Sequence, residues 1–327
     1  MLRKPTKVVT WIIWNMSGRN SMTTLKGICP IIATPFTKTG EVDFDSLQNQ
    51  IKFFADAGCH GATLFGIAGE YYKLSESEQN QMVKVVIDAC RRYNITSIIS
   101  VTTHATELAV KRAKELQDNG AHSLMLLPPF FMSPGAAAIN YHMKEVCNAV
   151  SIPVVLQYAP EQTGVAIDPS VLASVGKSCS TDVYYKIECK PAGAYTTSIL
   201  NQIDNARRVF IGNAGYQFIE LFDRGAIGAM PGGSMCDLYL DIYHAYTSGD
   251  RKKAMELHGS VLLPILNHIR QNAEEIIAYE KTILYKRGVI ATDYCRKPTF
   301  AKDKVFDALF EEFYELTKPY FSAGTVS

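Results

Sequence analysis

The sequence has no long apolar run and no block of charge of one sign. None of its apolar stretches approaches the length of about 20 residues that a membrane-spanning helix needs. The 33 lysines and arginines and the 32 aspartates and glutamates are interspersed and leave a net charge of +1. Proteins that bind nucleic acids or anionic membranes usually carry a basic patch. The sequence therefore argues against both as main partners and favours a small-molecule substrate.

Motifs for disulfides, metals and nucleotides are also missing. The eight cysteines are scattered without a Cys-x-x-Cys pair, and the seven histidines lack a spacing such as His-Glu-x-x-His. No Gly-x-Gly-x-x-Gly or Walker motif is present. We therefore expect the cysteines to be reduced core residues of a cytoplasmic protein. We expect no metal and no separate cofactor.

The first 21 residues differ in composition from the rest of the chain. They contain a short apolar stretch from Val8 to Trp14, no acidic residue, and four basic residues, namely Arg3, Lys4, Lys7 and Arg19. Such a composition is compatible with an organelle-targeting segment. A simpler interpretation is that Met22 is the native start and that residues 1–21 are an extension, disordered or non-native. This segment is excluded from the fold prediction.

From Leu25 onward, strand-like and helix-like segments alternate. The expected strands are short apolar or β-branched runs, as in sheets buried on both faces; they are Gly27–Thr34, Gly61–Gly66, Ser97–Thr103, Ser123–Pro129, Pro153–Ala159, Val183–Glu188, Arg208–Ala214 and Ala226–Gly233. Amphipathic helices are expected between them, including Asp45–Ala57, Ser75–Arg92, Thr106–Asn119 and Gln217–Asp223. Asp45, Ser75 (with a glutamate three residues later) and Thr106 are helix start signals, and Gly58 and Gly120 are stop signals.

This alternation predicts an α/β protein, a (β/α)₈ TIM barrel over residues 22–249. Barrels of this class commonly use about 250 residues as one domain. After Gly249 the pattern becomes wholly helical, and we expect helices at Ala254–Arg270, Ala273–Arg287 and Lys304–Thr317. Residues 250–327 are therefore predicted to form a helical C-terminal extension that packs on the barrel.

The strand Val183–Glu188 contains a lysine, Lys186, among apolar residues. Lysine is seldom fully buried, and a desolvated lysine loses its proton more easily and can attack a ketone to form a Schiff base. Glu188 lies two residues further on, so in a strand it points to the same face. The pair can equally be an internal ion pair, or the lysine can extend its amine from the strand end into solvent.

In a TIM barrel the chemistry lies at the carboxyl ends of the strands. Glycine-rich loops at these ends let backbone N–H groups converge on a carboxylate. Glu70 can instead stabilise the start of the next helix. The residues expected to bind substrate are Thr34, Gly66, Ile67, Ala68, Gly69, Glu70, Thr103, Gly212 and Met230.

Several of these segments carry a family resemblance: Gly27–Phe36 (GICPIIATPF), Gly66–Glu70 (GIAGE), the Tyr-Ala-Pro at 158–160, Lys186 and Gly228–Gly233. In this order they resemble the dihydrodipicolinate synthase / N-acetylneuraminate lyase family of Schiff-base barrel enzymes. The resemblance implies that Lys186 forms an imine with a 2-keto acid and that the 66–70 loop holds its carboxylate. It also implies that the subunits assemble into a homotetramer or a dimer.

The sequence departs from the aldolases of this family at three places. Ile67 and Ala68 stand where the aldolases usually have two hydroxyl residues. Phe130-Phe131 replaces a tyrosine pair of the synthases, and we expect these rings to form a hydrophobic wall. Gln157 falls at the position of the catalytic tyrosine, with Tyr158 one residue later. A shift of one residue reverses the side of the sheet, so packing outward against a helix is favoured for Tyr158.

A second branch of the family matches better. Gln157–Pro160, Lys186–Glu188, Gly228–Gly233 and Leu266–His268 resemble the 2-keto-3-deoxy-pentonate dehydratases and the related pyrroline-carboxylate deaminases. In that branch a glutamine replaces the tyrosine, and a glutamate two residues past the lysine handles protons. A carboxyl group on the face of the lysine could accept the proton next to the imine and later protonate the departing hydroxyl.

The sequence thus predicts a lyase that forms a Schiff base with a small 2-keto acid and removes water, or ammonia, from it. The predicted catalytic residues are Lys186, Glu188, Gln157 and Tyr158. One alternative is a pyruvate-dependent aldolase with Tyr158 as the proton carrier. Another is an inactive paralogue that binds a keto acid or a protein partner. The aldolase hypothesis predicts that Tyr158→Phe abolishes turnover, whereas the dehydratase hypothesis predicts this of Glu188→Gln.

Overall fold

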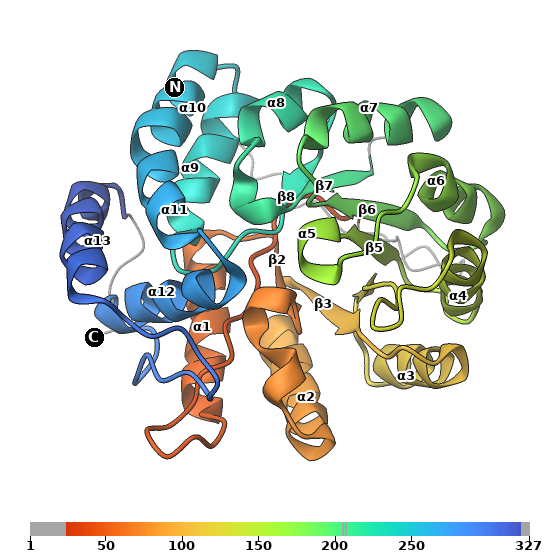
Figure 1. Ribbon diagram of the computed structural model, residues 1–327, viewed down its shortest axis with the longest axis horizontal. Helices are drawn as coiled ribbons and strands as arrows, with labels where there is room; N and C mark the ends of the chain where they lie inside the picture. The colour runs from red at the N-terminus through yellow and green to blue at the C-terminus, as the bar shows by residue number, and fades with distance from the viewer. Residues whose placement is uncertain (1–23, 205, 207, 322–327) are drawn as a thin grey trace, which may run out of the picture.

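The computed structural model describes residues 24–204, 206 and 208–321. The predictions for residues 1–21 lie outside this range. Eight parallel strands form the centre of the molecule (Figure 1). They are β1 (Gly27–Ile28), β2 (Gly61–Leu64), β3 (Thr96–Val101), β4 (Ser123–Leu126), β5 (Val154–Tyr158), β6 (Val183–Ile187), β7 (Val209–Ile211) and β8 (Gly228–Ala229).

The sheet closes into a barrel. Neighbouring strands follow one another around the sheet in the order β1-β8-β7-β6-β5-β4-β3-β2. Between the two ends of this order, Ile31 forms a parallel bridge with Thr63, and the N–H of Ile32 donates to the carbonyl of Thr63 at 2.9 Å. The predicted (β/α)₈ barrel is therefore confirmed.

Helices surround the strands. Those of the barrel are α1 (Phe44–Ala57), α2 (Glu76–Tyr93), α3 (Thr106–Asp118), α4 (Ala136–Asn148), α5 (Pro160–Thr163), α6 (Pro169–Ser178), α7 (Ala192–Gln202), α8 (Phe218–Asp223) and α9 (Cys236–Thr247). The C-terminal helices α10 (Arg251–Glu256), α11 (Leu263–Ile269), α12 (Ala273–Lys286) and α13 (Lys304–Thr317) gather beside α1 and α9 (Figure 1). The division of the chain at residue 249 stays a prediction.

Two expected elements differ in detail from the structure. The helix expected over 254–270 is interrupted by a π-helical segment, Leu257–Leu262, which separates α10 from α11. The first strand was expected to reach Thr34, but β1 ends at Ile28. Pro30 carries no N–H, so it cannot continue the ladder of hydrogen bonds at that position.

The helix boundaries follow side-chain capping. The Ser75 side chain accepts the N–H of Glu78, and the glutamate side chain returns to the N–H of Ser75, so the predicted capping box is present. Gly58 ends α1 in the left-handed conformation, as predicted. The prediction of Asp45 as the first cap was wrong, because Asp43 accepts the N–H of Ser46 and α1 begins before Asp45.

The alternation of side chains along the strands divides the core into two layers. One set packs between the strands and the helices. The other fills the barrel interior and consists of Leu25, Cys29, Ile31, Ile98, Met125, Val155, Tyr184, Phe210 and Met230.

All eight cysteines lie in the described ranges and are free, and all except Cys179 are buried. None of the helices in the described ranges combines the length and apolar character that a membrane crossing needs.

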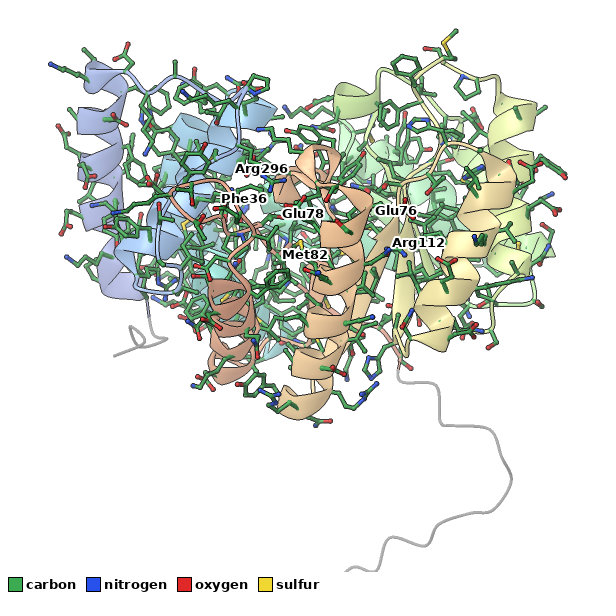
Figure 2. The ribbon with its side chains drawn as sticks, turned by 90° about the horizontal axis from the view of Figure 1, so that it is seen from below. Phe36, Glu76, Glu78, Met82, Arg112 and Arg296 are labelled. Atoms are coloured by element: carbon green, nitrogen blue, oxygen red, sulfur yellow. The ribbon has the colours of Figure 1, made fainter. Side chains whose placement is uncertain are left out.

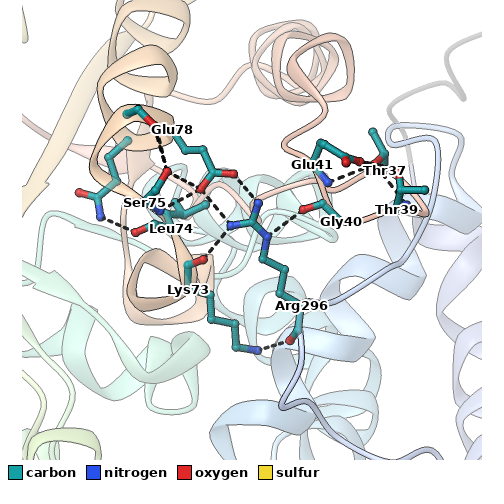
Figure 3. Close-up of polar contacts among 11 residues, drawn as sticks. Thr37, Thr39, Gly40, Glu41, Lys73, Leu74, Ser75, Glu78 and Arg296 are labelled. Carbon is teal, nitrogen blue, oxygen red and sulfur yellow. Dashed lines mark hydrogen bonds and ion pairs between the residues drawn. The ribbon is translucent and has the colours of Figure 1, made fainter.

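Arg296 joins the C-terminal segment to the start of α2. Its guanidinium donates to both carboxylate oxygens of Glu78, to the carbonyl of Lys73 at 2.8 Å and to the carbonyl of Gly40 at 2.8 Å (Figure 3). It also lies 4.5 Å from the ring centre of Phe36 (Figure 2). Arg296 therefore fastens the segment after α12 to the loops that follow β1 and β2.

We expect Arg296→Gln to lower the free energy of unfolding by roughly 1–2 kcal/mol at pH 7, since the Arg296–Glu78 pair is only partly screened by solvent. Hydrogen bonds from Arg296 are the main reason why the pKa of Glu78 falls from 4.5 to about 2. A depressed pKa contributes stability that is present above the unfolded value and lost as the pH falls towards 2.

Urea unfolding of the wild type and Arg296→Gln between pH 7 and pH 2 measures this effect. The difference between the two proteins should shrink as the pH approaches 2. Arg91→Gln is the matched control, because the Arg91–Asp88 pair is exposed on both sides and should contribute little at any pH. A difference that does not change with pH would contradict the proposed role of Glu78.

Candidate active site

A cavity of about 710 Å³ opens at the carboxyl ends of the strands. The loops after β2, β4, β5, β6, β7 and β8 line it on the barrel side. The turn between α11 and α12, together with Ile276 and Glu280 of α12, covers it from the C-terminal helices. Its position is that of the active site in TIM-barrel enzymes.

Lys186 lies at the bottom of this cavity because of the alternation along β6. Tyr184, two residues earlier, belongs to the interior cluster of the barrel. Tyr185 and Ile187 point outward into the layer between strands and helices. Lys186 therefore follows Tyr184 on the inner face, where only 3 % of its surface is exposed and its side chain lines the cavity.

Glu188 contacts the Lys186 amine, and Gln157 contacts Glu188. The Lys186 Nζ lies 3.0 Å from Glu188 Oε1, and the Gln157 Nε2 donates to the same oxygen at 2.6 Å. The other carboxylate oxygen accepts the N–H of Asn213 at 3.2 Å. The pairing of Gln157 with Lys186 in the β5–β6 register brings these side chains together. Three of the four predicted catalytic residues thus lie in one hydrogen-bonded group.

The surroundings of Glu188 keep it ionised. Burial raises the pKa of this carboxyl, but the charge of Lys186 and the hydrogen bonds from Gln157, Lys186 and the Asn213 backbone lower it more. The net result is a pKa below the ordinary value of 4.5. A carboxylate at the cavity floor is suited to accept a proton.

Gly212 makes room for Glu188. A Cβ atom at position 212 would stand only 2.2 Å from the Glu188 Cγ. Any larger residue would therefore push the carboxylate away from Lys186. Gly212 itself is not among the residues that line the cavity, so it contacts the Glu188 side chain rather than the cavity.

The 66–70 loop presents two of its five residues to the cavity. Ile67 and Ala68 line it, whereas Gly66, Gly69 and Glu70 do not. Thr34 donates its hydroxyl to the carbonyl of Gly69 and so holds the loop from beneath.

Glu70 supports this loop from the side of α12. Its fully buried side chain is ion-paired with Lys281 and with Lys73, the latter at 2.9 Å. Thr34 and Glu70 were both predicted to bind substrate, but their side chains contact the loop backbone and two lysines rather than the cavity.

Tyr158 points away from the cavity. Its ring stacks on Tyr195 of α7, with centroids 4.3 Å apart and an interplanar angle of 18°. It belongs to the layer between strands and helices, since Gln157 takes the inner face of β5. The predicted catalytic role of Tyr158 is not supported by this position, and the predicted outward packing agrees with it.

The remaining predicted residues are divided. Met230 and Phe130 line the cavity, whereas Thr103 does not. Phe131 is 81 % exposed and forms no wall. Three further parts of the lining were not among the predicted site residues, namely Asn213, the Arg270–Ala273 turn and Glu280. Asn213 follows β7 in a glycine-containing loop, which was a usable sequence signal for a place at the cavity. The sequence of α12 contains no such signal.

In the described part of the chain, no cluster of three His, Cys, Asp or Glu residues could hold a metal ion.

Comparison with known proteins agrees with this architecture. The model of the dihydrodipicolinate synthetase family matches residues 24–310. An L-2-keto-3-deoxyarabonate dehydratase of Azospirillum brasilense is 26 % identical over 278 residues, which cover 84 % of this chain and 88 % of the relative. A 4-hydroxy-tetrahydrodipicolinate synthase of Methanococcus aeolicus is 26 % identical over 236 residues, which cover 72 % of this chain and 80 % of the relative.

A solved structure gives the same result. The dihydrodipicolinate synthase of Rhodopseudomonas palustris superposes with a TM-score of 0.82 and 25 % identity, over 89 % of this chain and 97 % of that one. The family match begins just before β1 and ends within α13, so it includes Lys186 and the residues that line the cavity. The chain therefore belongs to the dihydrodipicolinate synthetase family and is an enzyme of the Schiff-base lyase class.

Proposed function

We propose that this enzyme dehydrates a 2-keto-3-deoxy sugar acid through an imine on Lys186. The observation that carries the proposal is the Lys186–Glu188–Gln157 group at the floor of the cavity, in which one ionised carboxylate contacts the lysine directly. No tyrosine hydroxyl takes part in this group among the described residues. The likeness to the Azospirillum brasilense dehydratase supports the same substrate class.

The chemistry follows from these positions. The Lys186 ammonium gives up a proton, and the resulting neutral amine attacks the C2 ketone. The ketone oxygen leaves as water with two of the ammonium protons, which gives an iminium ion. This cation withdraws electrons from C3, so that Glu188 can remove a C3 proton and generate an enamine. The enamine then expels the C4 hydroxyl, which leaves as water after gaining a proton. Hydrolysis of the imine releases the product and restores the lysine.

The charges around Glu188 suit an iminium intermediate. The Lys186 ammonium and the iminium carry the same charge, so the Glu188 carboxylate keeps a cationic partner when the substrate binds. Gln157 holds one carboxylate oxygen and the backbone of Asn213 holds the other. Glu188 is thereby oriented towards the carbon next to the imine before the reaction begins.

A turnover assay with 2-keto-3-deoxy-pentonates and 2-keto-3-deoxy-hexonates tests the proposal. We expect a product that lacks one molecule of water and no release of pyruvate. Formation of pyruvate and an aldehyde would favour the aldolase alternative. Binding of the keto acids without any turnover would favour the inactive paralogue. The predicted homotetramer or dimer can be checked on the same preparation by sedimentation.

A further inference from the structure

Glu280 is a second carboxyl group at the cavity. It lies in the middle of α12, its surface is only 2 % exposed, and its side chain lines the cavity together with Lys186 and Glu188. It comes from the C-terminal helices, whereas Glu188 comes from β6. The cavity therefore has carboxyl groups from two different parts of the chain.

One oxygen of Glu280 is left without a partner. Oε2 accepts the N–H of Ser234 at 2.9 Å, but Oε1 has no hydrogen-bond partner among the described residues. Lys281, the next residue, pairs with Glu70 instead, and Glu280 forms no ion pair with any described residue. Buried polar atoms are rarely left unsatisfied, so an open oxygen in a cavity wall calls for a ligand.

Gly232 shows where this oxygen lies. A Cβ atom at position 232 would stand 2.0 Å from Glu280 Oε1. Gly232 follows β8, lines the cavity and bridges to Ile31 at the top of the barrel. The absence of a side chain there lets the carboxyl group of α12 reach the mouth of the barrel.

The pKa values of the two carboxyl groups are shifted in opposite directions. Burial raises the pKa of Glu280, and the hydrogen bonds from Ser234 do not compensate for it. The nearby Tyr239, whose own pKa is also raised by burial, supplies no positive charge. Glu188, by contrast, has a lowered pKa because of Lys186 and its hydrogen bonds, although burial opposes this. Two carboxyl groups with opposite shifts in one site are the arrangement that separates an acid from a base.

We propose that Glu280 is the general acid that protonates the departing C4 hydroxyl, so that Glu188 acts only as the base. This inference rests on the dehydration proposed above and divides its two proton transfers between two residues. Glu188 gains the C3 proton as the C3–H bond breaks. Glu280 loses its proton to the hydroxyl as the C4–O bond breaks, and water leaves. Exchange with solvent then returns a proton to Glu280 and removes one from Glu188.

A change of leaving group tests the acid role. Fluoride leaves without protonation, whereas hydroxide does not. We expect Glu280→Gln to lower kcat for a 2-keto-3-deoxy-pentonate by roughly 10²–10⁴-fold. With the corresponding 4-fluoro analogue, the same variant should release fluoride within a few-fold of the wild-type rate. Equal losses on both substrates, or no loss on the hydroxyl substrate, would overturn the proposal.

The matched control is Glu275→Gln. Glu275 is a buried glutamate of the same helix, 2 % exposed, that does not line the cavity and accepts the N–H of Gln271 at 3.0 Å. Glutamine keeps an acceptor oxygen, so this variant should retain both activities. Glutamine at position 280 likewise keeps the acceptor for Ser234, and thermal unfolding checks that the variant is folded.

Two measurements separate this inference from the proposed function. Exchange of the methyl protons of pyruvate with deuterated solvent needs Lys186 and Glu188 but no acid for a leaving group, so Glu280→Gln should retain it. In the wild type, kcat for the hydroxyl substrate should fall as rising pH deprotonates Glu280. With the fluoro analogue this fall should be absent. A wild type that shows neither exchange nor fluoride release would refute the dehydratase proposal itself. If the wild type exchanges the methyl protons but Glu280→Gln loses equal activity on the hydroxyl and fluoro substrates, only the role of Glu280 is refuted.

Discussion

Lys186→Arg is expected to lower kcat by on the order of 10⁴-fold or more. Enzymes that lose a covalent nucleophile show decreases of this size. A guanidinium stays protonated and cannot form the imine, but it keeps a positive charge beside Glu188. The loss would therefore reflect the missing nucleophile rather than an unpaired buried carboxylate. Steady-state turnover of the keto acid that the wild type accepts is the measurement.

Two further variants make this result specific. Lys186→Ala should be as inactive as Lys186→Arg but less stable, because it leaves Glu188 without its ion-pair partner. Lys177→Ala removes an exposed lysine of α6 that does not line the cavity, and this variant should behave as the wild type. Substantial residual turnover in Lys186→Arg would show that no imine on this residue is required.

The second large effect concerns the choice of proton carrier. Glu188→Gln should lower kcat by roughly 10²–10⁴-fold, because a neutral amide cannot remove the C3 proton. Tyr158→Phe should change kcat by less than a few-fold, because the Tyr158 ring packs on Tyr195 outside the cavity. Parallel kinetics of the two variants on one substrate provide the comparison.

The pH profile adds an independent test of Glu188. Its pKa is lowered from the ordinary value of 4.5 in the folded protein, so the acid limb of kcat/KM, which reports the free enzyme, should lie below that value. In Glu188→Gln the remaining activity should lack this limb. If Tyr158→Phe is inactive and Glu188→Gln is nearly normal, the aldolase mechanism is favoured and the dehydration proposal is wrong.

The barrel could be predicted because its strands are short apolar runs separated by amphipathic helices. The contact between Lys186 and Glu188 could be predicted for a simpler reason, since residues two apart in a strand share a face. The same rule explains why Gln157 points inward and Tyr158 outward. These features depend on residues that are close together in the sequence, so the local sequence pattern is enough to predict them.

Features that depend on tertiary contacts could not be predicted. The hydrogen bond from Gln157 to Glu188 depends on the register between β5 and β6. Glu280 reaches the cavity only because α12 packs over the barrel and Gly232 leaves space for it. Thr34 and Glu70 lie in the segments that follow β1 and β2, yet their side chains turn to the loop and to Lys281. Residue type alone does not indicate such directions.

The central claim is that Lys186 forms an imine with a 2-keto acid. Borohydride reduction in the presence of pyruvate, followed by intact-mass and peptide analysis, tests it most directly. We predict a mass increase of one reduced pyruvate that maps to Lys186 and is absent from Lys186→Arg. Folded wild-type protein that gains no adduct with pyruvate or any 2-keto-3-deoxy acid, or an adduct on a different lysine, would contradict the claim.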